Sequence, residues 1–161
     1  LPFSFVMSVT IERKRVPMIE IRRHALVRHT PDQMFDLVND VEAYPSRFPW
    51  CAGARVLARE GDTELTAQLD LRFAGMTQGF TTRNTLKRPR SLHMHLVDGP
   101  LRALEGEWSF DPLGEDGCRI ALALDFDYAG RLGGAALRLG FQSVASRMVD
   151  DFCAAARSIH G

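Results

Sequence analysis

The sequence predicts an α+β fold in which a curved antiparallel sheet of about six or seven strands surrounds one long C-terminal helix, with two short helices after the first strand. Three patterns support this prediction. Apolar and polar residues alternate through most of residues 19–128, as in strands that bury one face. Short stretches rich in Gly, Pro and Asp separate these runs, and such short connections join antiparallel neighbours. Apolar residues then recur at helical steps within residues 132–159.

The composition bounds the class of protein. A chain of 161 residues fits one domain, since domains usually hold about 100–150 residues. Its 20 basic and 20 acidic residues cancel, so no overall charge would attract DNA. Cys51, Cys118 and Cys153 are odd in number and far apart, which indicates reduced thiols in a cytoplasm-like compartment. No apolar run approaches the ~18 residues needed to span a bilayer, so a cytoplasmic location is expected.

Residues 1–17 differ from the rest of the chain and allow two interpretations. An apolar stretch precedes the basic cluster Arg13-Lys14-Arg15, which reverses the order found in a signal peptide. In the first interpretation the segment is an upstream extension, and Met18 opens the real domain. In the second it is a basic, weakly amphipathic arm that touches a membrane surface. The folded domain is therefore expected to span residues 18–161.

The first strand is expected at residues 19–28, where apolar residues alternate with charged ones. Arg23 interrupts the apolar face, which favours a place at the edge or end of the sheet. A short helix follows, since Thr30 can cap it and Pro31 suits its first position. Residues 41–51 then form a second short helical or turn segment, because two prolines exclude a long helix there.

Six further strands are expected, joined by short turns into an antiparallel meander. Some alternate apolar and polar residues without a break, and others do so less regularly. The regular strands are 64–73, 104–111 and 118–128, and the weaker ones are 55–60, 78–87 and 91–97. Each regular strand places one face on a core and the other in solvent.

The C-terminal helix carries a long apolar stripe. Gly133, Gly134 and Gly140 lie in its first half, where each weakens the helix by about 1 kcal/mol relative to alanine. Small residues there also allow the helix to approach the sheet closely. The residues expected in the stripe are Leu132, Ala136, Leu139, Val144, Met148, Phe152, Ala155 and Ile159.

An internal cavity is expected from the widths of these elements. Six strands at about 4.8 Å each make a sheet roughly 25–30 Å wide, whereas a helix with its side chains is about 10–12 Å across. The sheet must curl around the helix, and the remaining space suits a ligand if apolar side chains line it. The alternative is that bulky residues fill the space, namely Phe73, Phe80, Trp108, Phe110 and Phe126.

Several motifs resemble those of a known family. They are Tyr44-Pro45-x-x-Phe48-Pro49-Trp50-Cys51, Phe80-Thr81-Thr82-Arg83-Asn84, Gly99-Pro100-Leu101, Leu104-x-Gly106-x-Trp108-x-Phe110, and Phe126 before the last helix. In this order and spacing, residues 18–161 resemble the coenzyme Q-binding START-like family of the polyketide cyclase/dehydrase-like superfamily. That family includes a bacterial ribosome association toxin.

The resemblance implies a helix-grip (START-like) fold whose tunnel holds ubiquinone or another lipid and supports respiratory electron transfer without catalysis. Residues 44–51 would form part of the tunnel mouth, and Leu101 stands where the family usually has an aromatic residue. The residues expected to contact the ligand are Tyr44, Phe48, Pro49, Trp50, Leu69, Leu71, Phe73, Phe80, Met94, Leu96, Trp108, Phe110, Leu124, Phe126, Met148 and Phe152. No cofactor is expected besides the bound quinone or lipid. Its exchange with the inner membrane would place the protein transiently at that surface.

Two other functions remain as alternatives. The first is binding to the large ribosomal subunit, as the toxin relative implies, and its sequence feature is a basic turn. The cations of this turn, Arg83, Lys87, Arg88 and Arg90, could contact phosphates or lipid headgroups, or could simply be solvated. The second alternative is an enzyme of the aromatase or cyclase type, which rests on fold analogy alone.

No catalytic or metal-binding residue is expected. His93 and His95 lie on the polar face of one strand, and no third ligand is suggested nearby. The carboxylate pairs, Glu105 with Glu107 and Asp125 with Asp127, fall on polar phases of their strands and are interpreted as a solvated face. Cys51 lacks a strongly cationic environment that would activate its thiol.

Overall fold

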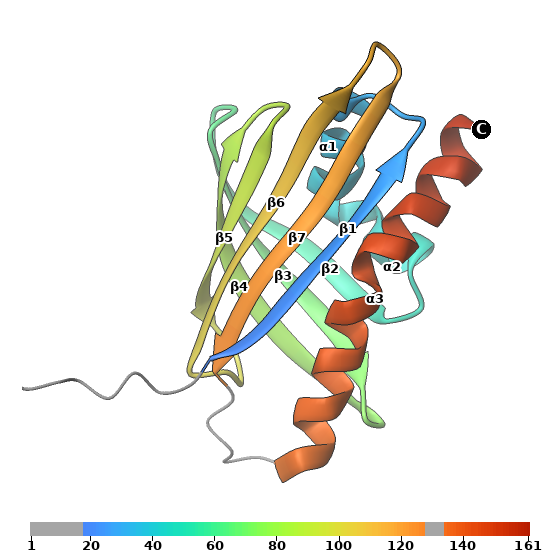
Figure 1. Ribbon diagram of the computed structural model, residues 1–161. Helices are drawn as coiled ribbons and strands as arrows, with labels where there is room; N and C mark the ends of the chain where they lie inside the picture. The colour runs from blue at the N-terminus through green and yellow to red at the C-terminus, as the bar shows by residue number, and fades with distance from the viewer. Residues whose placement is uncertain (1–17, 128–133) are drawn as a thin grey trace, which may run out of the picture.

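The computed structural model describes residues 18–127 and 134–161, and it confirms the α+β architecture. One antiparallel sheet of seven strands curves around the long helix α3, which runs along strand β1 (Figure 1). The predicted extension at 1–17 lies outside the described residues, as do Tyr128, Leu132 and Gly133. The elements are β1 (Ile19–Val27), α1 (Pro31–Asn39), η1 (Val41–Ala43), α2 (Tyr44–Arg47), β2 (Cys51–Glu60), β3 (Glu64–Phe73), β4 (Met76–Lys87), β5 (Ser91–Asp98), β6 (Ala103–Leu113), β7 (Gly117–Asp127) and α3 (Gly134–His160).

The strand order confirms the predicted meander. Strands β2 to β7 each pair with the next strand along the chain, and β1 pairs with β7. Strands β1 and β2 are therefore the two edges of the sheet, as the interruption at Arg23 indicated for β1. The short helices α1 and α2 follow β1; α1 lies at one end of the curved sheet, and α2 packs beside β2 (Figure 1). The core lies between the concave face of the sheet and α3.

The start of α1 follows the predicted capping pattern. The backbone amide of Gln33 donates to the Thr30 hydroxyl at 3.2 Å, and the amide of Thr30 donates to the Gln33 side chain at 2.9 Å. Pro31 occupies the first turn, where its missing N–H has no partner to lose. This reciprocal capping box stabilises a short helix that carries Met34 and Phe35 into the core.

Two weaker strands begin earlier than the alternation indicated. Strand β2 begins at Cys51, which pairs with Leu71, and β4 begins at Met76, which pairs with Phe73. The hairpin between β3 and β4 therefore turns on Ala74 and Gly75 alone, and both have positive φ. Two-residue hairpin turns favour such φ values because their twist matches that of the strands. The residue at which each strand begins is set by pairing with its neighbour, and the alternation within a single strand does not show it.

The prediction of the apolar stripe of α3 is wrong in part. Its buried residues are Leu137, Phe141, Val144, Ala145, Val149, Phe152, Cys153 and Ala156, with Met148 partly buried. In contrast, Ala136 is exposed, Leu139 is 59% exposed and Ile159 is 48% exposed. The expected stripe contained a step of five residues from Leu139 to Val144, which turns a helix by about 140°. Residues on opposite sides of such a step cannot share one face.

Gly140 confirms a close approach of α3 to the sheet. A Cβ atom at Gly140 would lie 3.2 Å from the Ala74 Cβ and 3.2 Å from the Phe73 Cδ2. That spacing is tighter than ordinary van der Waals contact. The first half of α3 therefore rests against the β3–β4 hairpin through a residue without a side chain.

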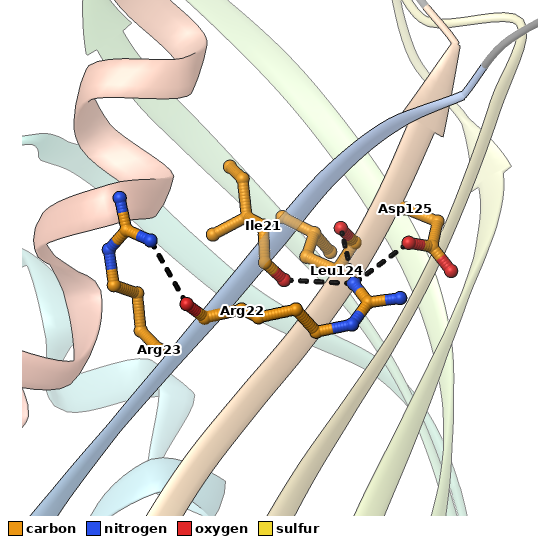
Figure 2. Close-up of polar contacts among 5 residues, drawn as sticks. All are labelled: Ile21, Arg22, Arg23, Leu124 and Asp125. Carbon is orange, nitrogen blue, oxygen red and sulfur yellow. Dashed lines mark hydrogen bonds and ion pairs between the residues drawn. The ribbon is translucent and has the colours of Figure 1, made fainter.

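Arg22 fastens the edge strand β1 to β7 on the outer face of the sheet (Figure 2). The Arg22 Nη1 donates to the carbonyl of Ile21 at 3.0 Å and to that of Leu124 at 3.3 Å, and it lies 2.8 Å from the Asp125 Oδ1. Arg23 lies on the α3 side of β1 and donates to the carbonyl of its own strand neighbour, Arg22, at 2.9 Å (Figure 2). Exposed ion pairs contribute little, about 0–1 kcal/mol. Asp125 therefore lies on the polar face that the alternation predicted, and its ion pair with Arg22 adds little stability.

A candidate apolar ligand site under the long helix

An apolar cavity lies between the concave face of the sheet and α3. Its volume is about 80 Å³. Helix α2, strands β3 to β7 and α3 all contribute to its wall. The lining residues are Tyr44, Leu69, Leu71, Phe80, Thr82, Met94, Leu104, Trp108, Leu122, Leu124, Phe141, Met148 and Phe152.

Most of the residues expected to contact a ligand line this cavity, and some do not. Those on its wall are Tyr44, Leu69, Leu71, Phe80, Met94, Trp108, Leu124, Met148 and Phe152. Those outside its wall are Phe48, Pro49, Trp50, Phe73, Leu96, Phe110 and Phe126. Sequence reasoning missed Thr82, Leu104, Leu122 and Phe141. Leu104 and Leu122 share the alternation of their strands with Trp108 and Leu124, so that signal could have found them.

Phe48 and Trp50 support the wall from behind. Their rings stack with centroids 4.8 Å apart, and Phe48 packs edge-on against Phe152 at 4.8 Å. The indole Nε1 of Trp50 donates to the Asp151 Oδ2 at 2.8 Å, which ties the segment after α2 to α3. Both aromatic residues are buried, so they hold Tyr44 and Phe152 in place without reaching the cavity.

Pro49 belongs to a separate surface groove. This groove has a volume of about 400 Å³ and lies between α2 and the last turns of α3, where Arg47, Asp151 and Ser158 also line it. It is larger than the internal cavity, but its lining is mixed in polarity. An apolar ligand gains free energy from contact with apolar surface, so the almost wholly apolar internal cavity is the better candidate site.

A second aromatic cluster closes the cavity near the β3–β4 hairpin. Phe80 and Phe141 stack with centroids 5.3 Å apart, and Phe126 packs edge-on against Phe141 at 4.7 Å. Phe73 lies behind them, 6.0 Å from Phe141. Phe126 and Phe73 are therefore structural support for the residues that face the space. Sequence reasoning missed Phe141 because the hydrophobic pattern alone does not show which side of α3 packs against the sheet.

Phe110 packs under α1 and away from the cavity. Its ring meets that of Phe35 edge-on at 5.7 Å, and both are fully buried. Leu101 is also buried, but it lies in the β5–β6 connection at the opposite end of β6. The end of the sheet beneath α1 is therefore filled by side chains, as the alternative interpretation expected for part of the interior.

The Tyr44 hydroxyl is already engaged inside the protein. It donates to the carbonyl of Val38, and burial raises the pKa of Tyr44 well above its ordinary value because the phenolate would lose its hydration. The hydroxyl therefore stays protonated and joins α2 to the end of α1. It does not act as an acid or a base at neutral pH.

Replacing Tyr44 with phenylalanine should lower the free energy of unfolding by about 1–3 kcal/mol, because the buried carbonyl of Val38 loses its partner. Ser46→Ala is the matched control, since Ser46 also donates to a backbone carbonyl, that of Ala43 at 2.9 Å, but on the surface. Its change should stay within about 0.5 kcal/mol. Urea unfolding measures both, and equal effects would contradict the role of the buried bond.

The floor of the cavity is made of movable side-chain ends. Gly106 faces inward on β6, and a Cβ there would lie 2.6 Å from the Met94 Cε and 2.8 Å from the Leu124 Cδ1. The ends of Met94 and Leu124 thus occupy the space that a side chain on β6 would take. Ligand sites usually measure about 300–1,000 Å³, so a ligand must displace flexible residues such as Met94 and Met148.

Apart from the Tyr44 phenol, the ionisable side chains lie outside the wall of the cavity. Glu105 bridges His93, at 2.9 Å, and His95 on the outer face, so the two histidines do meet a carboxylate. Even so, no group of three such side chains in residues 18–127 and 134–161 has the geometry to hold a metal ion.

Burial raises the pKa values of the cysteine thiols, that of Cys118 to about 11, because it disfavours the thiolate.

The basic turn is partly neutralised. Arg83 pairs with Glu64 at 3.1 Å, and Arg88 pairs with Asp36. The guanidinium of Arg88 also lies 4.5 Å above the Phe35 ring. Lys87 and Arg90 are exposed, and neither forms an ion pair within the part of the chain that the structure describes. Two of the four predicted cations thus remain available to an anionic partner.

None of the described helices is long and apolar enough to cross a membrane.

A curved sheet that grips one long helix around an apolar interior defines the START-like, helix-grip class of protein. Comparison of the sequence with known families agrees. Residues 27–153 match the family described as polyketide cyclase/dehydrase and lipid transport, and the chain belongs to this family.

Two curated relatives span nearly the same length. The ribosome association toxin RatA of Pseudomonas aeruginosa is 43% identical over 88% of this chain and 97% of its own. The mitochondrial coenzyme Q-binding protein coq10 of Schizosaccharomyces pombe is 26% identical over 86% of this chain and 87% of its own.

Two solved structures share the fold. The Zhui aromatase/cyclase from Streptomyces sp. R1128 has a TM-score of 0.77 at 20% identity, covering 88% of this chain and 94% of its own. A START superfamily protein from Mycobacterium smegmatis has a TM-score of 0.74 at 20% identity, covering 87% and 98%. At this identity the likeness extends to the fold alone.

Proposed function

We propose that the protein binds ubiquinone or a related hydrophobic lipid in its internal cavity, without catalysis, and so supports respiratory electron transport. The observation that carries this proposal is the chemistry of the cavity wall. All its residues are apolar or aromatic apart from Thr82, and no carboxylate, imidazole, amine or thiol is among them. Such a wall favours a hydrocarbon tail and an uncharged ring.

The same wall argues against the aromatase or cyclase alternative. Cyclisation and dehydration need a positioned acid or base. The hydroxyl of Tyr44 is used by the Val38 carbonyl, and that of Thr82 by a neighbouring side chain. The Streptomyces neighbour supports only the shared fold. Binding is therefore a better account of this interior than chemistry.

Quinone exchange would bring the protein to the membrane. Isoprenoid quinones reside in the bilayer, because transfer of their tails to water is unfavourable. A carrier that exchanges such a ligand would meet the inner membrane transiently at its surface. The name of the Schizosaccharomyces pombe relative, a coenzyme Q-binding protein, supports this ligand class.

The proposal is tested by identifying what the protein holds. Protein purified from cells without detergent is extracted with organic solvent, and the extract is analysed by mass spectrometry. Protein stripped of ligand is then offered decylubiquinone and re-isolated by gel filtration. Bound quinone or lipid in either experiment is the expected result. Protein that is consistently empty and takes up no quinone would contradict the proposal.

A second candidate function is association with the large ribosomal subunit. It is favoured by the 43% identity to a protein named as a ribosome association toxin, over nearly the whole of both chains. The exposed Lys87 and Arg90 at the β4–β5 turn supply cations for a phosphate backbone. Sucrose gradients of ribosomes with added protein test it. An unchanged ratio of free subunits to assembled ribosomes would argue against this function.

If this second function holds, reversing the charges of Lys87 and Arg90 should weaken binding to large subunits. The double variant Lys87→Glu/Arg90→Glu is expected to lose at least about tenfold in affinity at low salt and to lower the salt dependence of binding by about two phosphate contacts. The control, Arg59→Glu/Arg138→Glu, makes the same charge change at exposed positions on β2 and α3. Co-sedimentation measures both, and equal losses would exclude a specific role for the turn.

A further inference from the structure

Strand β4 turns two polar side chains toward the core. Phe80, Thr82, Asn84 and Leu86 form its inward face, and Arg83, Thr85 and Lys87 are exposed on the other. Asn84 is only 4% exposed. Its partners on the neighbouring strands are Leu65 on β3 and Met94 on β5, so its amide lies among apolar groups.

The amide of Asn84 is held at one end. The Thr82 hydroxyl donates to the Asn84 Oδ1 at 2.9 Å, and this is the hydrogen bond that the Asn84 side chain makes within the described residues. A carboxamide has an NH₂ group that can donate two hydrogen bonds and an oxygen that can accept two. Turning the amide over would pair its nitrogen with Thr82 and free the oxygen instead. In either orientation one end has no protein partner in the described chain.

Thr82 belongs to the wall of the cavity, and Asn84 lies next to it on the inward face of β4, outside the lining set. Thr82 lines the cavity directly, and so does Met94, the residue opposite Asn84 on β5. Movement of the flexible Met94 side chain, which ligand entry requires in any case, would uncover the amide. The Asn84 nitrogen is not among the wholly enclosed, unpartnered side-chain atoms of the described residues, so it keeps a small accessible surface. A ligand atom in the cavity beside it can therefore accept its free N–H.

We propose that Thr82 and Asn84 are the polar anchor of the cavity, where the Asn84 Nδ2 donates to a carbonyl oxygen on the ring of an amphiphilic ligand. Thr82 orients the amide by holding its oxygen, so that its nitrogen faces the ligand. The inference rests on the proposed ligand-binding function and narrows its ligand class. The preferred ligand carries a carbonyl-bearing ring, as a quinone does, and is not a plain hydrocarbon.

The test compares two probes that differ in ring oxygens. Decylubiquinone carries ring carbonyls, and decylbenzene has a ring and the same tail without oxygen. In Asn84→Leu, a variant of similar size, the Kd for decylubiquinone should rise about tenfold, the value of one buried hydrogen bond. The Kd for decylbenzene should stay within about twofold or fall. Gel filtration over a ligand series, with mass spectrometry of the bound fraction, gives both constants.

Two further variants separate anchoring from folding. Thr82→Val keeps the shape of the side chain and removes the hydroxyl that orients the amide, so it should raise the Kd for decylubiquinone in the same selective way. Thr85→Val makes the identical change on the exposed face of the same strand and should alter neither constant. Thermal unfolding checks that each variant is folded, and Thr82→Val provides the test if Asn84→Leu does not fold.

The outcomes distinguish the anchor from the underlying function. Selective loss of the quinone in Asn84→Leu or Thr82→Val supports the anchor. Equal losses for both probes, or no loss for either, would overturn it while ligand binding itself stands. Failure of the unchanged protein to bind either probe would overturn the proposed function and the anchor together.

Discussion

Replacing Trp108 with alanine is expected to lower the free energy of unfolding by about 3–5 kcal/mol and to weaken quinone binding. Trp108 is 2% exposed, lines the cavity and packs edge-on against Phe152 with centroids 5.2 Å apart. Its removal leaves a large void, which the curved sheet cannot close because neighbouring strands hold β6 in register. It also removes the largest aromatic surface that a ligand ring could contact.

Trp50→Ala is the matched control for this prediction. Trp50 is equally buried and belongs to the same aromatic cluster around Tyr44, but it lies outside the cavity wall. Trp50→Ala should lose about as much free energy of unfolding as Trp108→Ala. Its affinity for quinone, measured well below its melting temperature, should stay within a few fold of that of the unchanged protein. Guanidinium unfolding and decylubiquinone titration give the two quantities. Unchanged stability and uptake in Trp108→Ala would refute the place of its ring in the wall.

Replacing Gly106 with valine should abolish ligand uptake with a limited effect on folding. Any Cβ at this position meets Met94 and Leu124, at 2.6 and 2.8 Å, and drives their ends into the cavity. The displaced atoms are the far ends of flexible side chains, so overpacking should cost about 1–3 kcal/mol. Valine itself suits a strand better than glycine, which offsets part of this loss. The affinity for decylubiquinone should fall more than tenfold.

Ala123→Val controls for the added methyl groups. Ala123 on β7 pairs with Glu107, the residue that follows Gly106 on β6. Its side chain therefore points to the face of the sheet opposite the cavity. The control should bind decylubiquinone like the unchanged protein. If Gly106→Val also binds normally, the ligand site lies elsewhere, and the groove beside Pro49 would become the better candidate. The variant thus separates loss of binding from loss of fold, which Trp108→Ala alone does not.

The regular strands were predictable because each alternates without interruption. The inward set on β7, from Cys118 to Phe126, is buried at every second residue as the pattern indicates. Strand β4 was harder to interpret, since Thr82 and Asn84 are polar on the inward face and Arg83 is polar on the outward one. Sequence reasoning therefore found no polar group inside. The pair became visible only when register placed Asn84 between Leu65 and Met94.

The helix shows a second limit of the same kind. Apolar residues occur on more than one side of α3, and Leu139 and Phe141 are equally plausible core residues by hydrophobicity alone. The sheet selects Phe141, which meets Phe80 and Phe126, and leaves Leu139 exposed. Contact with a distant part of the chain decides the phase of the helix.

The local elements and their order follow from the amino-acid pattern. The Thr30 cap, the short turns and the two-residue alternation depend on interactions between neighbours in the chain, and short turns force antiparallel pairing. In contrast, contacts between distant parts of the chain set which aromatic residues face open space and which pack behind them. A cavity of about 80 Å³ is what remains when side chains from seven elements meet, and a change of helix phase or strand register by one residue would relocate it.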